Sequence, residues 1–535
     1  MARSKEQNYL HGAVILTVGV IIMKILGAIY KIPLGNMLGN EGYALFLSSY
    51  NVYGVFLTLA TAGLPVALSR MISEANSQGR HLQVRRAFSV SQKAFFVLGF
   101  VCTLVMLLFP DWLAGTVLHN PDAAKSIWVL APSVLLCCIT SSYRGFSQGH
   151  GNMIPTTVGQ VIEVLAKVIA GLALAWYFTS NGYDNSVSSA GAVFGVTVGS
   201  LAALIYMIVS QHRNYRYDTL AEPDVPDSDS VILKNLIRIG VPIALGSIVL
   251  SLVNLIDSSQ CMGRLQNAAG FSYSEAKALY GTYGYAQTLY NLPAAFITPL
   301  TISIIPAIAM KLAGGLKDEA SKISEDSLRI SAAMCLPMGI GLSVLADPII
   351  RLLYSDVHES GPMLLFALGF ASVFVCMYLM STAVLQAAGK EKLTLISIVI
   401  GGAVKIAVNY ILVGNPDINI YGAPIGTIAC YFSMCAMNYV FMCRSLDKAP
   451  RLSRVLLRPV LATLIMAAVA YGVYLLMSGI LAPTGRLSTA LDLCVAIAAA
   501  VIAYAVFAIK LRAITAEDMT LIPKGDKIAK LLHMK

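Results

Sequence analysis

The chain has 535 residues, of which 57% are hydrophobic and only 12% are charged, and its formal net charge is +10. Soluble domains carry roughly 25% charged residues, so this composition excludes a water-soluble fold of this size. The basic excess does not indicate nucleic-acid binding, because the Lys and Arg residues are spread through short loops without a nucleic-acid-binding motif.

Apolar stretches of about 20 residues, the length needed to cross a hydrocarbon core of roughly 30 Å, recur along the whole chain. They predict an all-α integral membrane protein of about fourteen transmembrane helices. The basic segment 1–7 precedes a first stretch that is too long for a secretory signal and lacks a cleavage site, so we expect an uncleaved first helix. In chain order the predicted spans are 11–33, 43–66, 89–110, 126–146, 155–178, 189–211, 235–257, 280–309, 328–347, 362–387, 393–413, 421–443, 455–478 and 488–510.

The distribution of basic residues predicts the orientation of these spans. With the N-terminus in the cytoplasm, about 29 Lys and Arg residues fall in cytoplasmic segments and about six in external ones. This is the bias that the positive-inside rule requires, so both termini are expected to be cytoplasmic.

An internal repeat relates the two halves of the chain. Residues 148–167 (QGHGNMIPTTVGQVIEVLAK) align with 386–405 (QAAGKEKLTLISIVIGGAVK), and 191–195 (GAVFG) resembles 422–426 (GAPIG). Spans 4 to 6 thus repeat as spans 10 to 12, which predicts two pseudo-symmetric six-helix lobes around a central site. The predicted division is 1–211 for the N-terminal lobe, 212–234 for a cytoplasmic linker, 235–443 for the C-terminal lobe and 444–535 for two extra helices and a basic tail.

Prolines interrupt two of the spans. Pro65 in the second span and Pro306 in the eighth occupy similar places, and the eighth span adds Pro293 and Pro299. Because proline removes a backbone hydrogen bond, we expect these helices to be bent or broken, either as moving transporter helices or as static packing kinks.

Several lysines fall inside predicted spans, where a charge costs roughly 2.5–3.5 kcal/mol without a partner or a watery cavity. Lys24 lies near mid-membrane, and Lys31, seven residues on, shares its helical face. Glu163 and Lys167 are four residues apart, so they either form an intrahelical ion pair or bind substrate. Lys405, the repeat counterpart of Lys167, has no such acid on its own helix and is a candidate binding residue.

Other polar residues complete the candidate substrate site. Asp257 either pairs with a lysine or a cation, or is an exposed helix-end residue, and Arg144 either receives phosphate or anchors the topology. Tyr283, Gln287 and Asn291 recur at helical spacing and are candidates to line a wet cavity, although Tyr is also common at membrane interfaces. The mainly cationic set favours an anion such as a diphosphate and disfavours an organic cation.

The sequence contains no motif for a cofactor, a metal ion or catalysis. The ten cysteines lie mostly in apolar segments without metal-ligand spacing, and no phosphate-binding loop of an NTPase occurs. The longest external loop, near 258–279, offers only Glu275 as an acid beyond the helix end, so we expect a transporter rather than an enzyme.

Short motifs along the chain resemble a known family. They are KILG at 24–27, GYALF at 42–46, ATAGLP at 60–65, RGFSQG at 144–149, and PT at 155–156 followed by Gln160, Glu163 and Lys167. This combination resembles the branch of lipid II flippases and stage V sporulation protein B within the multidrug/oligosaccharidyl-lipid/polysaccharide flippase superfamily.

The resemblance implies an alternating-access flippase in the bacterial cell membrane. It implies two lobes around a cationic cavity that contains Lys24, two C-terminal helices that form a groove for a lipid tail, and no cofactor. The implied substrate is an undecaprenyl-diphosphate-linked glycan, with lipid II as the first candidate, and membrane lipid and cell-wall synthesis proteins are candidate partners. Some relatives hold sodium with carboxylates in the second lobe; here Lys405 and Asn409 stand on that span without a carboxylate, so we hypothesise that Lys405 replaces the cation.

Other functions stay open on the sequence alone. A flippase for capsule, teichoic-acid or spore-cortex intermediates would recognise the same diphosphate. A multidrug or cation antiporter should carry an acid in place of Lys24. A membrane glycosyltransferase and a scaffold in cell-wall assembly are further alternatives.

Overall fold

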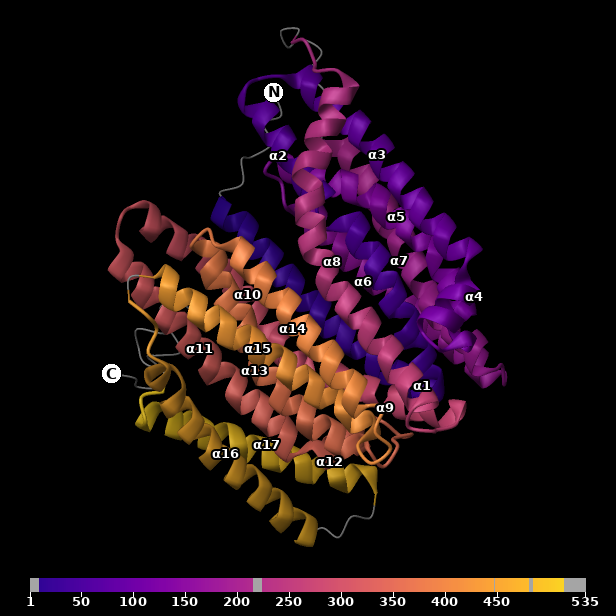
Figure 1. Ribbon diagram of the computed structural model, residues 1–535, viewed down its shortest axis with the longest axis vertical. Coiled ribbons are helices and arrows are strands. Elements are labelled where there is room, and N and C mark those ends of the chain that lie inside the picture. Colours follow the sequence, from indigo (N-terminus) through magenta and orange to yellow (C-terminus); the bar gives the residue numbers. More distant parts are fainter. Residues whose placement is uncertain (1–8, 215–223, 447, 481–484, 514–535) are drawn as a thin grey trace. The chain divides into compact units, whose positions relative to one another are not determined.

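The computed structural model describes residues 9–214, 224–446, 448–480 and 485–513, and within these ranges the chain is helical with short connections (Figure 1). The helices are α1 (Tyr9–Thr61), α2 (Leu64–Ser77), α3 (His81–Leu108), α4 (Pro110–Trp112), α5 (Ala124–Gly149), α6 (Ile154–Ser180), α7 (Asn185–Asn214), α8 (Asp229–Asn267), α9 (Tyr273–Tyr290), α10 (Leu292–Ala313), α11 (Lys317–Val344), α12 (Ala346–Leu353), α13 (Gly361–Ala387), α14 (Glu391–Leu412), α15 (Gly422–Ser445), α16 (Leu452–Ile480) and α17 (Arg486–Lys510).

Thirteen segments of the described residues are long and apolar enough to cross a membrane. They confirm the prediction of an all-α, multi-pass membrane protein, and each predicted span from 89–110 onward coincides with one of them. The segment Leu26–Ser77 contains the end of the first predicted span and all of the second, because α1 runs without a loop through the first span and most of the second and departs from helical geometry only at Gly39. The φ of Gly39 is 67°, a conformation that glycine adopts without steric cost, so one kinked residue replaces the expected loop.

Two helix breaks occur at prolines, as the sequence predicted. The chain leaves helical geometry between α1 and α2, and Pro65 lies in the first turn of α2. It breaks again at Asn291, with Pro293 in the first turn of α10, whereas Pro299 and Pro306 lie inside α10. Proline is tolerated in a first turn because its missing amide hydrogen would have no intrahelical partner there.

The chain forms two compact units, which we call unit 1 (Met1–Gly281) and unit 2 (Thr282–Lys535). In the first, α7 packs against both α5 and α6, and α2 and α3 also pack on α5. In the second, α15 packs against both α13 and α14, and α10 and α11 also pack on α13. The repeat predicted for spans 4 to 6 and 10 to 12 is therefore present in the packing. The lobe boundaries at 211 and 235 stay a prediction, and part of the predicted linker, 215–223, lies outside the described residues.

Equivalent glycines allow equivalent helix contacts in the two units. A Cβ atom added to Gly195 of α7 would lie 2.7 Å from the carbonyl oxygen of Lys167, and one added to Gly426 of α15 would lie 3.5 Å from that of Lys405. At Gly195 this distance leaves room for glycine alone, whereas at Gly426 the carbonyl lies at ordinary contact distance and the side-chain oxygen of Asn409 is the atom that an added Cβ would overlap. The two repeat lysines thus occupy matching places on their helices.

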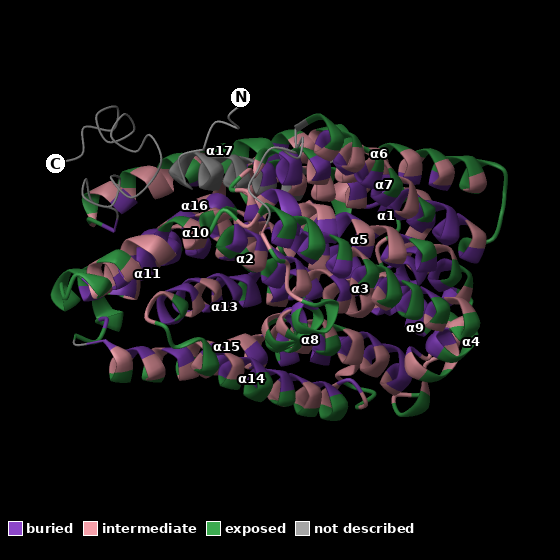
Figure 2. Cartoon of the chain, turned by 90° about the horizontal axis from the view of Figure 1, so that it is seen from above, coloured by how far each residue is buried: buried purple, intermediate pink, exposed green. Residues whose placement is uncertain are grey.

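Apolar side chains bury the helix faces that meet inside each unit, while the opposite faces stay exposed (Figure 2). The two C-terminal helices belong to the second unit, where α16 packs against α11 and α17. The hydroxyl of Tyr504 on α17 donates a hydrogen bond to the carbonyl of Ala333 on α11. This contact helps to place the C-terminal pair beside α11.

Candidate substrate-binding site

Arg144 and Glu163 form an ion pair between α5 and α6. The guanidinium Nη2 of Arg144 donates to Oε2 of Glu163 at 2.6 Å, and the two side chains are only 15% and 23% exposed. The intrahelical pair of Glu163 with Lys167, which the sequence left open, is not formed. The carboxylate of Glu163 instead pairs with Arg144 of the preceding helix, α5.

Lys167 contacts aromatic rings instead. Its Nζ lies 5.6 Å from the ring centroid of Tyr30 and 6.0 Å from that of Tyr50. Tyr30 is buried and its hydroxyl donates to the carbonyl of Ala192 at 3.0 Å, so the ring is fixed in place. Aromatic faces attract an ammonium group without forming an ion pair with it.

A network of small polar groups surrounds Glu163 inside unit 1. The thiol of Cys137 lies 3.9 Å from Oε1 of Glu163, 3.2 Å from the hydroxyl of Ser200 and 3.6 Å from that of Tyr53. This polar network could not be predicted from the sequence, because Cys137 has the pattern of an ordinary small core residue. Its thiol nevertheless connects α5 with α1, α6 and α7 in a buried polar network.

Of the two candidate lysines on α1, the structure describes the side chain of Lys31 alone. The side chain of Lys24 lies outside the described residues, so its predicted role stays a prediction. Lys31 is half-buried on α1.

Asp257 is buried on α8, with 5% of its surface exposed, ten residues before the end of that helix at Asn267. The alternative of an exposed helix-end residue is therefore wrong, because α8 extends well beyond the predicted span. Beside it, Ser258 accepts a hydrogen bond from the hydroxyl of Tyr280 at 2.7 Å, and Asn51 donates to the same hydroxyl at 3.2 Å.

The polar residues of α9 do not share one environment. Tyr283 is buried, and its hydroxyl lies 3.5 Å from that of Thr427 on α15. Gln287 and Tyr290 are half-exposed, and the exposed Asn291 donates to the carbonyl of Gln287 at 2.7 Å. Tyr283 thus packs against a neighbouring helix, and Asn291 is the most accessible member of the group, followed by Gln287 and Tyr290.

Lys405 is buried on α14, with only 6% of its surface exposed. The other buried residues of α14 are uncharged: Thr394, Ser397, Ile398, Gly401, Gly402 and Asn409. A cation therefore lies inside a membrane-spanning helix whose buried face carries no carboxylate.

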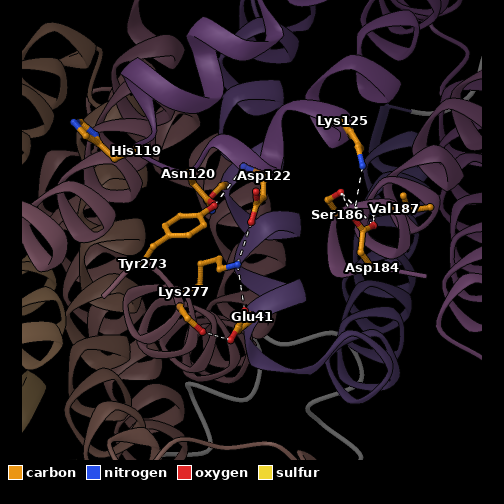
Figure 3. A network of polar contacts seen from close by, with 12 residues as sticks. Glu41, His119, Asn120, Asp122, Lys125, Asp184, Ser186, Val187, Tyr273 and Lys277 are labelled. Atoms are coloured by element: carbon orange, nitrogen blue, oxygen red, sulfur yellow. Dashed lines mark hydrogen bonds and ion pairs between the residues drawn. The ribbon is translucent and has the colours of Figure 1, made fainter. Parts of the chain in front are cut away.

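A second cluster of charges, at the start of α9, was not foreseen from the sequence (Figure 3). The ammonium of Lys277 is buried and lies 3.2 Å from Oε2 of Glu41 and 3.1 Å from Oδ2 of Asp122. It also lies 4.5 Å from the ring centroid of Tyr273, whose hydroxyl donates to Asn120 at 2.7 Å. The sequence places Lys277 only in a loop, because its partners come from two distant segments.

An exposed ion pair lies near this cluster. Nζ of Lys125 is 3.6 Å from Oδ2 of Asp184, and both side chains are exposed. The backbone amide of Val187 donates to Asp184 at 2.9 Å, and this hydrogen bond lowers the pKa of the carboxyl group.

An apolar groove of about 560 Å³ lies in unit 2, between α10, α11, α12, α16 and α17. Its lining is almost wholly hydrocarbon, with Tyr504 as its one hydroxyl-bearing side chain. It is lined by Leu292, Pro293, Phe296, Pro337, Met338, Gly341, Leu342, Leu345, Ile349, Met466, Ala470, Ile497, Ala500, Val501, Tyr504, Ala505, Ala508 and Ile509. The two C-terminal helices thus form one wall of an apolar groove, as the family resemblance implies, while its use by a lipid tail stays a prediction.

Residues 9–311, more than half of the chain, match the family described as polysaccharide biosynthesis protein. The chain belongs to the polysaccharide biosynthesis protein family. It is 26% identical over 533 residues to the uncharacterized membrane protein YabM of Bacillus subtilis (strain 168). This match covers 98% of the present chain and 96% of the relative. It is 25% identical over 455 residues to the lipid II flippase MurJ of the same organism, with 82% and 83% of the two chains covered.

A solved structure, that of lipid II flippase MurJ in an inward closed conformation, shares the fold of this polysaccharide biosynthesis protein. The TM-score is 0.68 at 15% identity, and the match covers 93% of this chain and 99% of the other. The names of these flippases describe transport rather than catalysis. Together with the thirteen apolar segments, they identify a multi-pass membrane protein with a transporter fold.

Proposed function

We propose that this protein is an alternating-access flippase that carries an undecaprenyl-diphosphate-linked cell-wall precursor, with lipid II as the first candidate, from the inner to the outer leaflet of a bacterial membrane. Similarity to lipid II flippase MurJ along most of the chain supports the proposal. The observation that carries it is the positive charge held inside membrane-spanning helices, above all by the buried Lys405.

An anionic headgroup would explain why these basic side chains lie inside membrane-spanning helices. A charge near the bilayer centre costs roughly 2.5–3.5 kcal/mol, and a diphosphate offsets that cost through charge-assisted hydrogen bonds. An organic cation would meet repulsion from the same residues. Lys24, Lys31, Arg144 and Lys167 are the further basic candidates for this contact.

The polyprenyl tail would occupy the apolar groove beside α16 and α17. Hydrocarbon is stabilised there by burial at roughly 25 cal/mol per Å², and the lining offers almost nothing that could bind a sugar. The saccharide would meet polar groups such as Gln287 and Asn291.

The membrane potential can drive such a cycle without a nucleotide. About 100 mV is worth about 2.3 kcal/mol for each charge that crosses the membrane. An inside-negative potential drives an anion outward or returns an empty, positively charged site inward.

A reconstituted flipping assay tests the proposal. Purified protein in proteoliposomes should move lipid II between leaflets, and Lys405→Ala should slow this movement about tenfold or more, because one charge-assisted contact contributes about 1.5–3 kcal/mol. Faster movement of another lipid-linked glycan would favour that substrate instead. Lipid II that stays in the inner leaflet, together with efflux of cationic dyes, would overturn the proposal.

The groove can be tested separately with a matched pair of variants. Ala500→Trp places an indole in the groove and should reduce flipping, whereas Gly472→Trp on α16, where a Cβ would meet no atom within 4 Å, should not. Equal flipping by both variants at equal expression would contradict the role of the groove.

A further inference from the structure

In unit 2, the start of α16 lies beside the end of α17. Arg458 lies in the second turn of α16, and its guanidinium Nη1 donates to the carbonyl oxygen of Arg512, just beyond the end of α17, at 3.3 Å. Ala462, one turn after Arg458, packs in an apolar cluster with Ala508 and Ala513. The two helices run side by side (Figure 1), so folding brings together two arginines that are 54 residues apart in the chain.

This meeting point, which we call the basic end, concentrates positive charge. Four exposed basic side chains there form no ion pair with a described residue: Arg451, Arg458, Lys510 and Arg512. Arg454 differs from them, because its Nη1 lies 3.8 Å from Oε1 of Glu325. The sequence that follows, 514–535, carries four lysines against three acidic residues, so it brings no net negative charge.

Membrane topology explains why basic residues occur here but not how they are arranged. The positive-inside rule requires Lys and Arg in cytoplasmic segments and does not depend on which segments touch. Lys390 and Lys392, at the start of α14, are exposed on the same predicted side of the membrane, yet neither lines the apolar groove. The basic end is different, because it gathers charge from two segments beside that groove.

The apolar groove of unit 2 reaches the basic end. Ala508 and Ile509 line the groove, and Lys510 and Arg512 follow them in the chain. The rest of the lining is almost wholly hydrocarbon. A molecule with an anionic head and a hydrocarbon chain would match both parts, and basic residues beside a membrane attract anionic lipids.

We propose that the basic end binds the headgroup of an anionic phospholipid whose acyl chain lies in the groove beside α16 and α17. A guanidinium carries five donors in a planar fork that matches phosphate, and Arg458 uses one of them on Arg512. A zwitterionic phospholipid has the same phosphate but adds a cation, which these side chains repel. The site goes beyond the proposed function because it recognises a membrane lipid by its charge, whatever precursor is moved.

The test measures lipid binding to the full chain in detergent by native mass spectrometry. The probes are phosphatidylglycerol and phosphatidylcholine with identical acyl chains, and glycerol 3-phosphate, which has the phosphate without the chains. Wild type should bind phosphatidylglycerol about tenfold more tightly than phosphatidylcholine. Arg458→Gln combined with Arg512→Gln should weaken binding of phosphatidylglycerol about 10- to 30-fold, because each basic residue beside a membrane contributes roughly a factor of five.

Two further variants separate charge from structure. Arg458→Lys combined with Arg512→Lys keeps both charges and should keep the preference for phosphatidylglycerol. Lys390→Gln combined with Lys392→Gln removes the same charge from an exposed site away from the groove, and should bind phosphatidylglycerol within about twofold of wild type. Ala505→Trp, which fills the groove and leaves the basic end intact, should weaken binding of both phospholipids.

Several results would overturn the site. Equal binding of the two phospholipids by wild type would exclude recognition of charge, and equal losses in the arginine variant and the Lys390/Lys392 control would show attraction to the whole basic side of the protein. Glycerol 3-phosphate that binds as tightly as phosphatidylglycerol would show an anion site without a lipid. These results leave the proposed function untouched, because the flipping assay tests it separately.

Discussion

Replacing Asp224 should loosen the start of α3. Asp224 follows the predicted linker, and its carboxylate accepts hydrogen bonds from the backbone amides of Leu82 at 2.7 Å and Gln83 at 3.0 Å. Arg80, the residue before α3, supplies no side-chain cap. A residue far along the chain therefore caps this helix.

The expected loss follows from that geometry. Removing a helix cap costs about 0.5–2 kcal/mol, and the contact of Asp224 with Arg80, at 3.9 Å, adds at most about 1 kcal/mol because Arg80 is partly exposed. A loss of about 1–2 kcal/mol raises the population of the locally unfolded state, in which the first turn of α3 is open, about 5- to 30-fold. Asp224→Ala, which removes both acceptor oxygens, should accelerate amide exchange at Leu82 and Gln83 by this factor.

The same cap has a predictable pH dependence. Burial works to raise the pKa of Asp224, but the amides of Leu82 and Gln83 outweigh it, so the pKa is lowered. A carboxyl group with a lowered pKa stabilises the folded state above its unfolded value of about 3.9. Its contribution is present at pH 7 and is lost as the pH falls through the folded pKa.

Hydrogen exchange with mass spectrometry checks this prediction on peptides that cover the start of α3. Asp229→Ala is the matched control, because Asp229 pairs with Arg86 through side chains that are both about half-exposed, and such pairs contribute about 0–1 kcal/mol. Wild-type exchange in Asp224→Ala, or equal acceleration in the control, would refute the reasoning.

Two further pairs of substitutions test the packing of unit 1 by thermal unfolding in detergent. Gly63→Ala should destabilise by about 1–3 kcal/mol, because its Cβ would overlap the carbonyl oxygen of Gly240, whereas Gly54→Ala, where a Cβ meets nothing within 4 Å, should stabilise by about 0.5–1 kcal/mol. Lys277→Ala should cost about 1–3 kcal/mol because it leaves two carboxylates without their ammonium, whereas Lys125→Ala should cost less than about 1 kcal/mol, since its ion pair is exposed. Equal effects within either pair would contradict the contacts on which these expectations depend.

The sequence alone determined the features that depend on local composition. Spans, fold class and internal repeat could be predicted because crossing a hydrocarbon core requires about 20 apolar residues in a row, whatever their neighbours. The broken helices at Pro65 and Pro293 were predictable for the same local reason, since proline lacks an amide hydrogen.

Only the tertiary structure decided which charged groups meet. From spacing alone Glu163 could pair with Lys167, yet Arg144 takes its carboxylate and Tyr30 lies beside the lysine. Hydropathy gives the length of a helix but neither its rotation nor its neighbours, and an ion pair depends on both. The burial of Asp257 and the partners of Lys277 were out of reach for this reason.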